Sequence, residues 1–261
     1  MPRLHVKRDP RGVARVTLAR PEVLNAFDEL MIADLTAAFI SLGNDATVRI
    51  VVLAAEGRAF CAGADLRWMQ RQSTNTLAQN LSDAQTFANL LRIIYECPKV
   101  TLARVSGDAY GGGMGLIAAT DIALSTHAAQ FSISEARFGI VPAVIGPYLV
   151  QTLGARQAKR LALTTQTFSA SEAQALGLIH DVVRPDQLDA TVEQEVKRLL
   201  QSAPSAVAEI KQLYRTLATA PITEETCELT AQTIARVRAT DEAREGFAAF
   251  FERRRAGWMP Q

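Results

Sequence analysis

Apolar runs of strand length, two of them followed directly by glycine-rich segments, constrain the fold more than any other feature of this sequence. Residues 49–54 (RIVVLA) and 100–105 (VTLARV) lack the alternation of polar and apolar residues that a half-exposed strand shows, and residues 121–124 (DIAL) form a shorter run. Such runs are typical of strands buried on both faces, as in a parallel sheet covered by helices. We therefore expect an α/β core.

Patterns around these runs predict further elements. Residues 13–18 (VARVTL) alternate as a half-buried strand does. Two segments carry apolar residues on one helical face, residues 29–42 and residues 80–95. The first has Asp28 as its candidate N-cap and is expected to end at Gly43.

The pattern from about residue 147 onward is almost entirely helical. Amphipathic stretches follow one another to the end of the sequence, and no linker rich in proline, glycine or serine separates them from the earlier part. We expect an α/β core over residues 1–200 and a helical C-terminal region over residues 201–261.

Composition narrows the classes of partner and compartment. Among 261 residues, 48% are hydrophobic and 21% are charged, which is enough apolar material for a substantial core. The net charge of +1 gives no long-range attraction to nucleic acid. No stretch is long and apolar enough for a membrane span, and the three cysteines fit neither a disulfide framework nor a zinc site. We expect a cytoplasmic protein with no metal site and no nucleic-acid or membrane partner.

Small residues are concentrated in two segments, residues 57–66 and 107–115. Each lies where a strand leads into a helix, so unpaired backbone N–H groups there can bind negative charge. If the two strands are neighbours, N–H groups from both segments can stabilise an oxyanion that develops on a carbonyl. Simple tight turns are the alternative, and the GxGxxA pattern at residues 113–118 leaves a weaker dinucleotide-binding alternative.

Glu135 is the candidate acid/base. It lies in the largely apolar segment FSISEARFGIVP, where burial would raise the pKa of its carboxyl group and suit it to proton transfer near neutral pH. An ion pair with Arg137, or a solvated glutamate at a helix end, remains an alternative.

Several short motifs, taken in order along the chain, resemble the enoyl-CoA hydratase/isomerase superfamily, also called the crotonase superfamily. ARPEVLNAF resembles its N-terminal acyl-CoA loop, AFCAGADL and SGDAYGGGMGL its two oxyanion loops, SISEARFGIVPA its catalytic glutamate segment, and EGFAAFFERRRAGW its closing helix. The resemblance implies an α/β fold, a crotonase-like spiral of ββα units with a helical C-terminal trimerisation region. It also implies a homotrimer or a dimer of trimers.

The same resemblance implies roles for individual positions. The backbone N–H groups of Ala64 and Gly112 would hold the thioester carbonyl, and Glu135 would move the proton. The substrate would be an acyl-CoA thioester, with no metal, redox group or other cofactor. The positions implied to lie against this substrate are Leu24, Ala26, Ala62, Asp65, Leu66 and Gly115.

Gly115 is a departure from the family's two-glutamate hydratases, because it stands where those enzymes carry their first glutamate. Glycine cannot transfer a proton. Either Glu135 works with water and another group, with Ser134, Tyr148 and Asp83 as candidates, or the reaction needs only one acid/base, as in shifting a double bond.

The segment FGIVPAVIGPY, together with GADLRWM, resembles methylglutaconyl-CoA and isohexenylglutaconyl-CoA hydratases of leucine and acyclic terpene catabolism. Their substrates are 3-branched and carry a distal carboxylate, so Arg67 or Arg137 is a candidate to face it. The leading hypothesis is therefore hydration of a branched glutaconyl-CoA. The alternatives are a Δ3,Δ2-enoyl-CoA isomerase that uses the single glutamate, and a non-catalytic acyl-CoA-binding protein.

Overall fold

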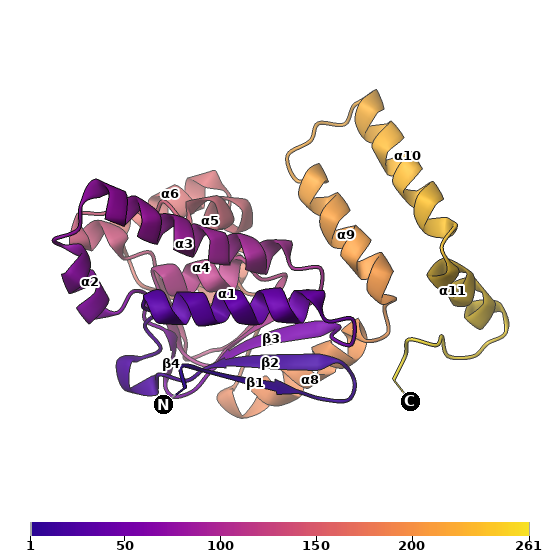
Figure 1. The fold of residues 1–261 in the computed structure, drawn as a ribbon, viewed down its shortest axis with the longest axis horizontal. Coiled ribbons are helices and arrows are strands. Elements are labelled where there is room, and N and C mark those ends of the chain that lie inside the picture. The colour runs from indigo at the N-terminus through magenta and orange to yellow at the C-terminus, as the bar shows by residue number, and fades with distance from the viewer. Residues whose placement is uncertain (1, 261) are drawn as a thin grey trace.

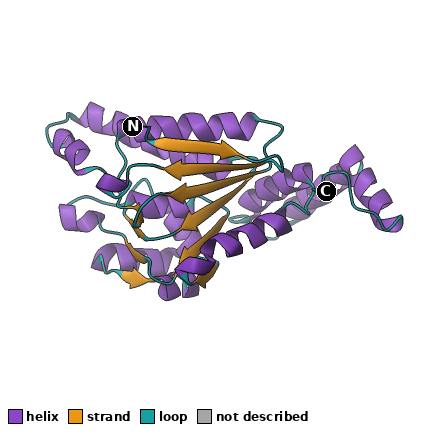
Figure 2. Ribbon diagram, turned by 90° about the horizontal axis from the view of Figure 1, so that it is seen from below, coloured by secondary structure: helices purple, strands orange, loops and turns teal. Residues whose placement is uncertain are grey.

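Two β-sheets form the centre of the computed structural model, which describes residues 2–260. The larger sheet has the strand order β1-β2-β3-β5-β7-β10 and is parallel except for the β1–β2 pair. Helices lie on both sides of it (Figure 2), so the α/β expectation is confirmed. Its strands are β1 (Leu4–Arg8), β2 (Val13–Leu18), β3 (Ile50–Ala55), β5 (Val100–Val105), β7 (Ile122–Thr126) and β10 (Asp181–Val183).

The apolar runs of β3 and β5 are the buried centre of this sheet. Alternate residues of the two strands belong to different hydrophobic clusters, one with Leu53 and Val105 and the other with Val52 and Leu102. The first cluster contains residues of α1 (Glu29–Asn44), α3 (Leu77–Glu96) and α4 (Gly112–Ala118), and the second contains residues of α8 (Leu188–Leu199). Because both faces are covered, neither strand shows polar alternation.

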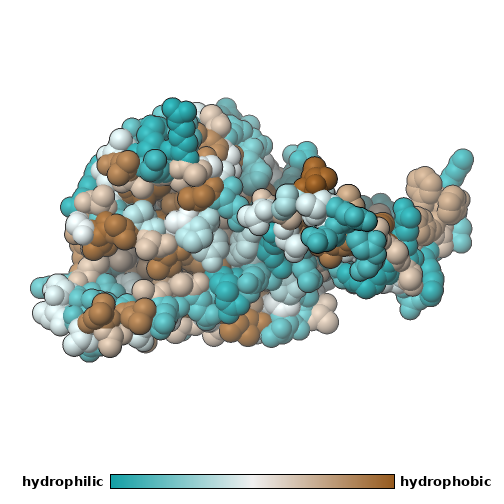
Figure 3. Space-filling model, turned by 90° about the horizontal axis from the view of Figure 1, so that it is seen from above, coloured by the Kyte–Doolittle hydropathy of each residue, from teal (hydrophilic) through white to brown (hydrophobic). Residues whose placement is uncertain are grey.

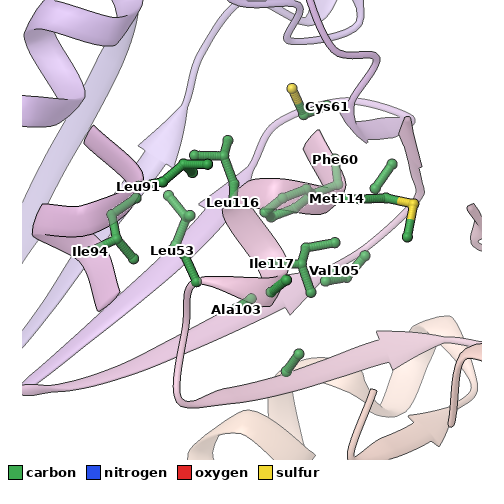
Figure 4. Packing of buried hydrophobic residues seen from close by; sticks show 14 of the residues in the cluster. Leu53, Phe60, Cys61, Leu91, Ile94, Ala103, Val105, Met114, Leu116 and Ile117 are labelled. Carbon is green, nitrogen blue, oxygen red and sulfur yellow. The ribbon is translucent and has the colours of Figure 1, made fainter. Parts of the chain in front are cut away.

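The smaller sheet is formed by short strands, two of which lie within the glycine-rich segments 57–66 and 107–115. Its order is β4-β6-β8-β9, with β4 (Ala59–Cys61), β6 (Asp108–Tyr110), β8 (Gln130–Ser132) and β9 (Phe168–Ser169). Figure 4 shows Phe60 and Cys61 of β4 close to Met114 of α4. Core packing, together with the pairing of β4 with β6, therefore holds the two glycine-rich segments next to each other.

The remaining helices complete the body and a C-terminal arm. In the body lie α2 (Leu66–Gln72), α5 (Gly146–Leu153), α6 (Ala155–Thr164) and α7 (Ala170–Ala175), with the 3-10 helices η1 (Pro21–Val23), η2 (Glu135–Phe138) and η3 (Pro185–Gln187). The arm consists of α9 (Pro204–Leu217), α10 (Glu224–Arg238) and α11 (Asp241–Phe251), which lie to one side of the body in Figure 1.

Some element boundaries differ from the expectation for local reasons. Helix α1 continues one residue past Gly43, so this glycine does not end it. Helix α3 begins at Leu77, because Thr76 and Gln79 form a reciprocal capping box there. The region after residue 147 also contains β9 and β10, which are two and three residues long and too short to show a strand pattern.

Polar contacts fix the start of the arm to the body. The ammonium group of Lys211 on α9 donates to the carboxylate of Asp121 (2.5 Å) and to the carbonyl of Lys99 (2.8 Å). Helices α9 and α10 bury none of their residues within the chain.

No helix among the described residues has the combination of length and apolar character required to cross a bilayer.

Candidate active site

A cavity of about 620 Å³ lies between α2, α3, the start of α4 and the segment that carries Glu135. Its wall is mostly apolar, with a few polar side chains, which is typical of sites for small molecules. The lining residues include Phe27, Ala62, Gly63, Ala64, Leu66, Trp68, Asp83, Phe87, Tyr110, Gly111, Gly112, Ser132, Ser134, Glu135, Arg137, Ile145 and Thr167.

The two glycine-rich segments converge at this cavity. A methyl group built on Gly63 would lie 3.0 Å from the carbonyl oxygen of Tyr110 and 3.8 Å from the backbone nitrogen of Gly112. Ala64 is held in a bridge with Phe27, in which the N–H groups of Phe27 and Asp65 donate to the carbonyls of Gly63 and Phe27. Gly63, which precedes Ala64, thus lies near Gly112, and both Ala64 and Gly112 line the cavity.

The backbone N–H groups of Ala64 and Gly112 are free to bind an oxygen. Within residues 2–260, neither of them donates to another group of the protein. Gly112 is the first residue of α4, where the helix leaves its N–H groups without acceptors. Two such donors in a mostly apolar cavity can stabilise negative charge on a carbonyl oxygen.

Glu135, at the start of η2, is a mostly buried carboxylate. Burial raises the pKa of its carboxyl group, although the backbone N–H groups of Glu135 and Ser134 oppose this shift. Its Oε2 atom is buried and has no hydrogen-bond partner among residues 2–260. Such a carboxyl group is suited to accept and return a proton near neutral pH.

The alternative interpretations of Glu135 are wrong in this structure. Arg137 is not paired with it, because the Nε and Nη2 atoms of Arg137 donate to the Oγ1 (3.0 Å) and the carbonyl (2.7 Å) of Thr165. The buried Oε2 of Glu135 also excludes a solvated helix-end role. Instead, Arg137 ties η2 to the loop after α6.

Gly111 is in direct contact with the Glu135 carboxylate. It has a positive φ of 49°, and a methyl group built on it would lie 3.1 Å from Oε1 of Glu135 and 3.6 Å from Oγ of Ser134. A side chain at this position would be strained and would press on the carboxylate. The glycine before Gly112 thus allows Glu135 to approach the free N–H groups.

Gly115 lies inside α4 and is not part of the cavity wall. A methyl group built on it would lie 2.4 Å from Cγ2 of Ile145, which is itself buried. The space next to Gly115 is therefore filled by a hydrocarbon side chain, and a glutamate cannot be accommodated there without repacking.

The other positions expected at the substrate divide into two groups. Ala62 and Leu66 line the cavity, whereas Leu24, Ala26 and Asp65 do not. The N–H of Ala62 donates to the carbonyl of Leu24 (3.0 Å), so Leu24 is hydrogen-bonded to a residue of the cavity wall. These three outer positions lie beside the cavity rather than in it.

Asp65 has a structural role that its sequence position did not reveal. Its carboxylate accepts hydrogen bonds from the N–H groups of Arg67 (2.9 Å) and Trp68 (3.3 Å) and so caps α2. It also accepts from Nη2 of Arg20 at 2.9 Å. Burial raises the pKa of Asp65, but these donors outweigh burial and lower it overall.

The candidates for a second polar group are not equally placed. Tyr148 does not line the cavity, and its ring packs against Tyr95 at 5.6 Å. Asp83 and Ser134 both line it. Arg67 is also absent from the wall, which leaves Arg137 as the arginine that faces the cavity.

Aromatic side chains of the wall were not predicted. The rings of Phe27 and Phe87 stack at 4.7 Å, and Trp68 meets Phe27 edge to face at 6.1 Å. Phe87 belongs to the apolar face of α3, which the sequence does show, but periodicity alone does not separate a core residue from a residue on a cavity wall.

Within the described part of the chain, no three His, Cys, Asp or Glu side chains are grouped as metal ligands.

Several known proteins are similar to this chain over nearly its full length. A family described as enoyl-CoA hydratase/isomerase matches residues 8–261. A mevalonyl-coenzyme A hydratase of Aspergillus fumigatus is 30% identical over 94% of this chain and 90% of its own length. A 1,2-epoxyphenylacetyl-CoA isomerase of Escherichia coli is 31% identical over 94% of each chain. The solved structure of an enoyl-CoA hydratase from Shewanella pealeana superposes with a TM-score of 0.95 and 38% identity, covering 98% of this chain and 96% of that one.

Proposed function

The chain belongs to the enoyl-CoA hydratase/isomerase family, and from this premise we propose that it adds water to the α,β double bond of an enoyl-CoA thioester. It is then a hydro-lyase in which Glu135 is the acid/base. The observation that supports this most is the buried, unpartnered Oε2 of Glu135 in the same cavity wall as the free N–H groups of Ala64 and Gly112.

The reaction follows from these groups. The N–H groups of Ala64 and Gly112 donate to the thioester oxygen, which withdraws electrons from the β carbon. Glu135 takes a proton from water while the water oxygen bonds to that carbon and an enolate forms. The protonated Glu135 then gives the proton to the α carbon as the enolate collapses, so one carboxyl group completes the cycle.

The proposed substrate is a 3-branched glutaconyl-CoA, such as methylglutaconyl-CoA or isohexenylglutaconyl-CoA. Arg137 supports this class, because it lines the cavity and donates to Thr165 through only two of its three guanidinium nitrogens. A guanidinium group pairs well with a distal carboxylate. An Arg137→Gln variant should lose kcat/KM for methylglutaconyl-CoA more than for crotonyl-CoA; an unchanged preference between the two would exclude this role.

The function is tested by incubating the protein with crotonyl-CoA, 3-methylglutaconyl-CoA and isohexenylglutaconyl-CoA in 18O-labelled water. Mass spectrometry should find the label in the hydroxyacyl product of at least one of them, and the rates identify the acyl class. Failure to incorporate label into any of the three would contradict the proposal.

A Δ3,Δ2-enoyl-CoA isomerase is the second candidate, because Ile145 fills the space beside Gly115 and leaves a single glutamate. Moving a double bond requires one base that serves two carbons and requires no water. Conversion of a 3-enoyl-CoA without uptake of labelled oxygen, together with no hydration of the three esters above, would favour it.

The proposed assembly is a homotrimer or a dimer of trimers. The arm supports this proposal, because no residue of α9 or α10 is fully buried within the chain and apolar side chains on the arm remain exposed. Figure 3 shows hydrophobic residues interspersed with hydrophilic ones along the part that extends from the body.

A further inference from the structure

Hydration requires a water molecule that is held in a defined orientation, and one carboxylate oxygen does not define it. A second hydrogen bond is needed so that a lone pair of the water oxygen faces the β carbon of the substrate. Gly115 offers no side chain for this purpose, and Ile145 offers only hydrocarbon. The cavity wall must therefore supply the second group from elsewhere.

Several polar side chains of the cavity wall already make hydrogen bonds within the protein. The hydroxyl of Ser132 donates to the carbonyl of Thr165 (3.1 Å), and the hydroxyl of Tyr110 donates to the carboxylate of Asp108 (3.0 Å). The carboxylate of Asp83 accepts from two side-chain amides of the α2–α3 region. Each of these side chains is therefore held in place by a hydrogen bond that it already makes.

Ser134 is different. It occupies the N-cap position of η2, where a serine hydroxyl ordinarily accepts a hydrogen bond from the helix backbone, yet its side chain makes no capping bond. It lines the cavity, and within residues 2–260 its hydroxyl has no other hydrogen-bond partner in the protein. This hydroxyl is therefore free to bind a water molecule in the cavity.

The free hydroxyl lies near the carboxylate of Glu135. Ser134 and Glu135 are neighbours in the chain, and both side chains flank Gly111, at 3.6 Å and 3.1 Å from a methyl group built there. Gly112, which follows, is one of the two residues whose N–H groups face the thioester. A water molecule that binds Glu135 beside the β carbon is thus within reach of Oγ of Ser134.

We propose that Ser134 is the second ligand of the attacking water, in place of the carboxylate that Gly115 lacks. In this step the water carries two hydrogens: Glu135 removes one, and Oγ of Ser134 accepts a hydrogen bond from the other. The second hydrogen stays on oxygen and becomes the hydroxyl hydrogen of the product, while the first passes from Glu135 to the α carbon. This inference rests on the proposed hydration.

The test separates addition of water from proton transfer at carbon. Addition is measured as 18O incorporation into the enoyl-CoA that the wild type hydrates fastest among crotonyl-CoA, 3-methylglutaconyl-CoA and isohexenylglutaconyl-CoA. Proton transfer is measured as deuterium exchange at the α carbon of the saturated counterpart in D2O, which needs Glu135, Ala64 and Gly112 but no attacking water.

Ser134→Ala should lower the rate of 18O incorporation about 10- to 100-fold, as expected when one of the two hydrogen bonds that orient the attacking water is lost, and should change α-carbon exchange less than about threefold. Ser134→Thr keeps a hydroxyl and should retain the wild-type ratio of the two rates. Ser171→Ala is the matched control, because Ser171 is an exposed serine of α7 that does not line the cavity; its ratio of the two rates should not change.

Equal losses of both rates in Ser134→Ala would show that Ser134 only positions the carboxylate of Glu135. No loss of either rate would show that Ser134 does not hold the water. Either result overturns the proposal. If Ser134→Ala does not fold, Ser134→Cys, which keeps the shape with a weak hydrogen-bonding group, should give the same selective loss. A wild type that exchanges the α proton but hydrates none of the three esters refutes the proposed function itself. A wild type that hydrates them, together with a Ser134→Ala variant that hydrates them equally well, refutes only the role of Ser134.

Discussion

At the scale of single residues, the surroundings of Glu135 determine what its carboxyl group can do. Burial raises its pKa, and its Oε2 has no hydrogen-bond partner in the described part of the chain. The same carboxyl group can therefore be a base toward water and an acid toward carbon within one turnover. A pKa raised above the ordinary glutamate value favours this double role.

The pH dependence of the reaction follows from this shift. The carboxylate form, which takes the proton from water, is lost as pH falls through the raised pKa. The value of kcat/KM for hydration should therefore decline on the acid side at a pH above the ordinary glutamate value of 4.5, and should level off above the raised pKa. A kcat/KM that remains constant down to pH 4.5 would contradict this account.

Gly111→Ala tests the contact between the backbone and Glu135. The added methyl group would lie 3.1 Å from Oε1 at a φ of 49°, so we expect the carboxylate to shift and kcat to fall about 10- to 100-fold with a smaller change in KM. Gly154→Ala is the control, because Gly154 also has a positive φ (73°) but has no atom within 4 Å of the added methyl group. Loss of stability in both variants with full kcat in both would argue against a positioning role for Gly111.

At the scale of elements, the close packing of α4 against Ile145, the residue that precedes α5, determines which acid/base groups the cavity contains. Gly115→Ala should cost about 1–3 kcal/mol, because its methyl group would lie 2.4 Å from Cγ2 of Ile145. Adding Ile145→Ala removes that side chain, so the double variant should be more stable than the sum of the two single effects predicts. Thermal and urea unfolding of the four proteins measure this coupling, and additive effects would refute the packing argument.

The elements that could be predicted from the sequence are those whose pattern is local. The strands at residues 13–18 and 100–105 are found at their predicted bounds, because buried apolar runs and alternation are visible in the sequence. Strand β10 was missed, because its three residues gain their place only by pairing with β7. Long-range pairing of this kind leaves no local signal.

The candidate site was predictable to a similar degree. The sequence identified Glu135 and both glycine-rich segments, since small residues after a strand and a carboxylate in an apolar segment are themselves the signal. It could not show that Asp65 pairs with Arg20 or that Ile145 occupies the space beside Gly115, because these contacts join residues far apart in the chain.

At the scale of the whole molecule, the arm has more apolar surface than a single chain can cover. Phe250 and Phe251 of α11 are 77% and 78% exposed, and large exposed apolar groups that lie together typically mark an interface. We expect the protein to elute as a trimer or a hexamer. Phe250→Asp should lower the mass measured by size-exclusion chromatography with light scattering, whereas a monomeric wild type would contradict the proposed assembly.

The central claim is that one buried carboxyl group carries the proton in both directions of the hydration step. Its most direct test is the rate of 18O incorporation by Glu135→Gln under single-turnover conditions, with binding of the CoA ester measured in parallel. The account predicts a fall of about 100-fold or more with the dissociation constant nearly unchanged, since the amide keeps the shape but cannot take a proton. Retention of more than about a tenth of the wild-type rate would contradict it.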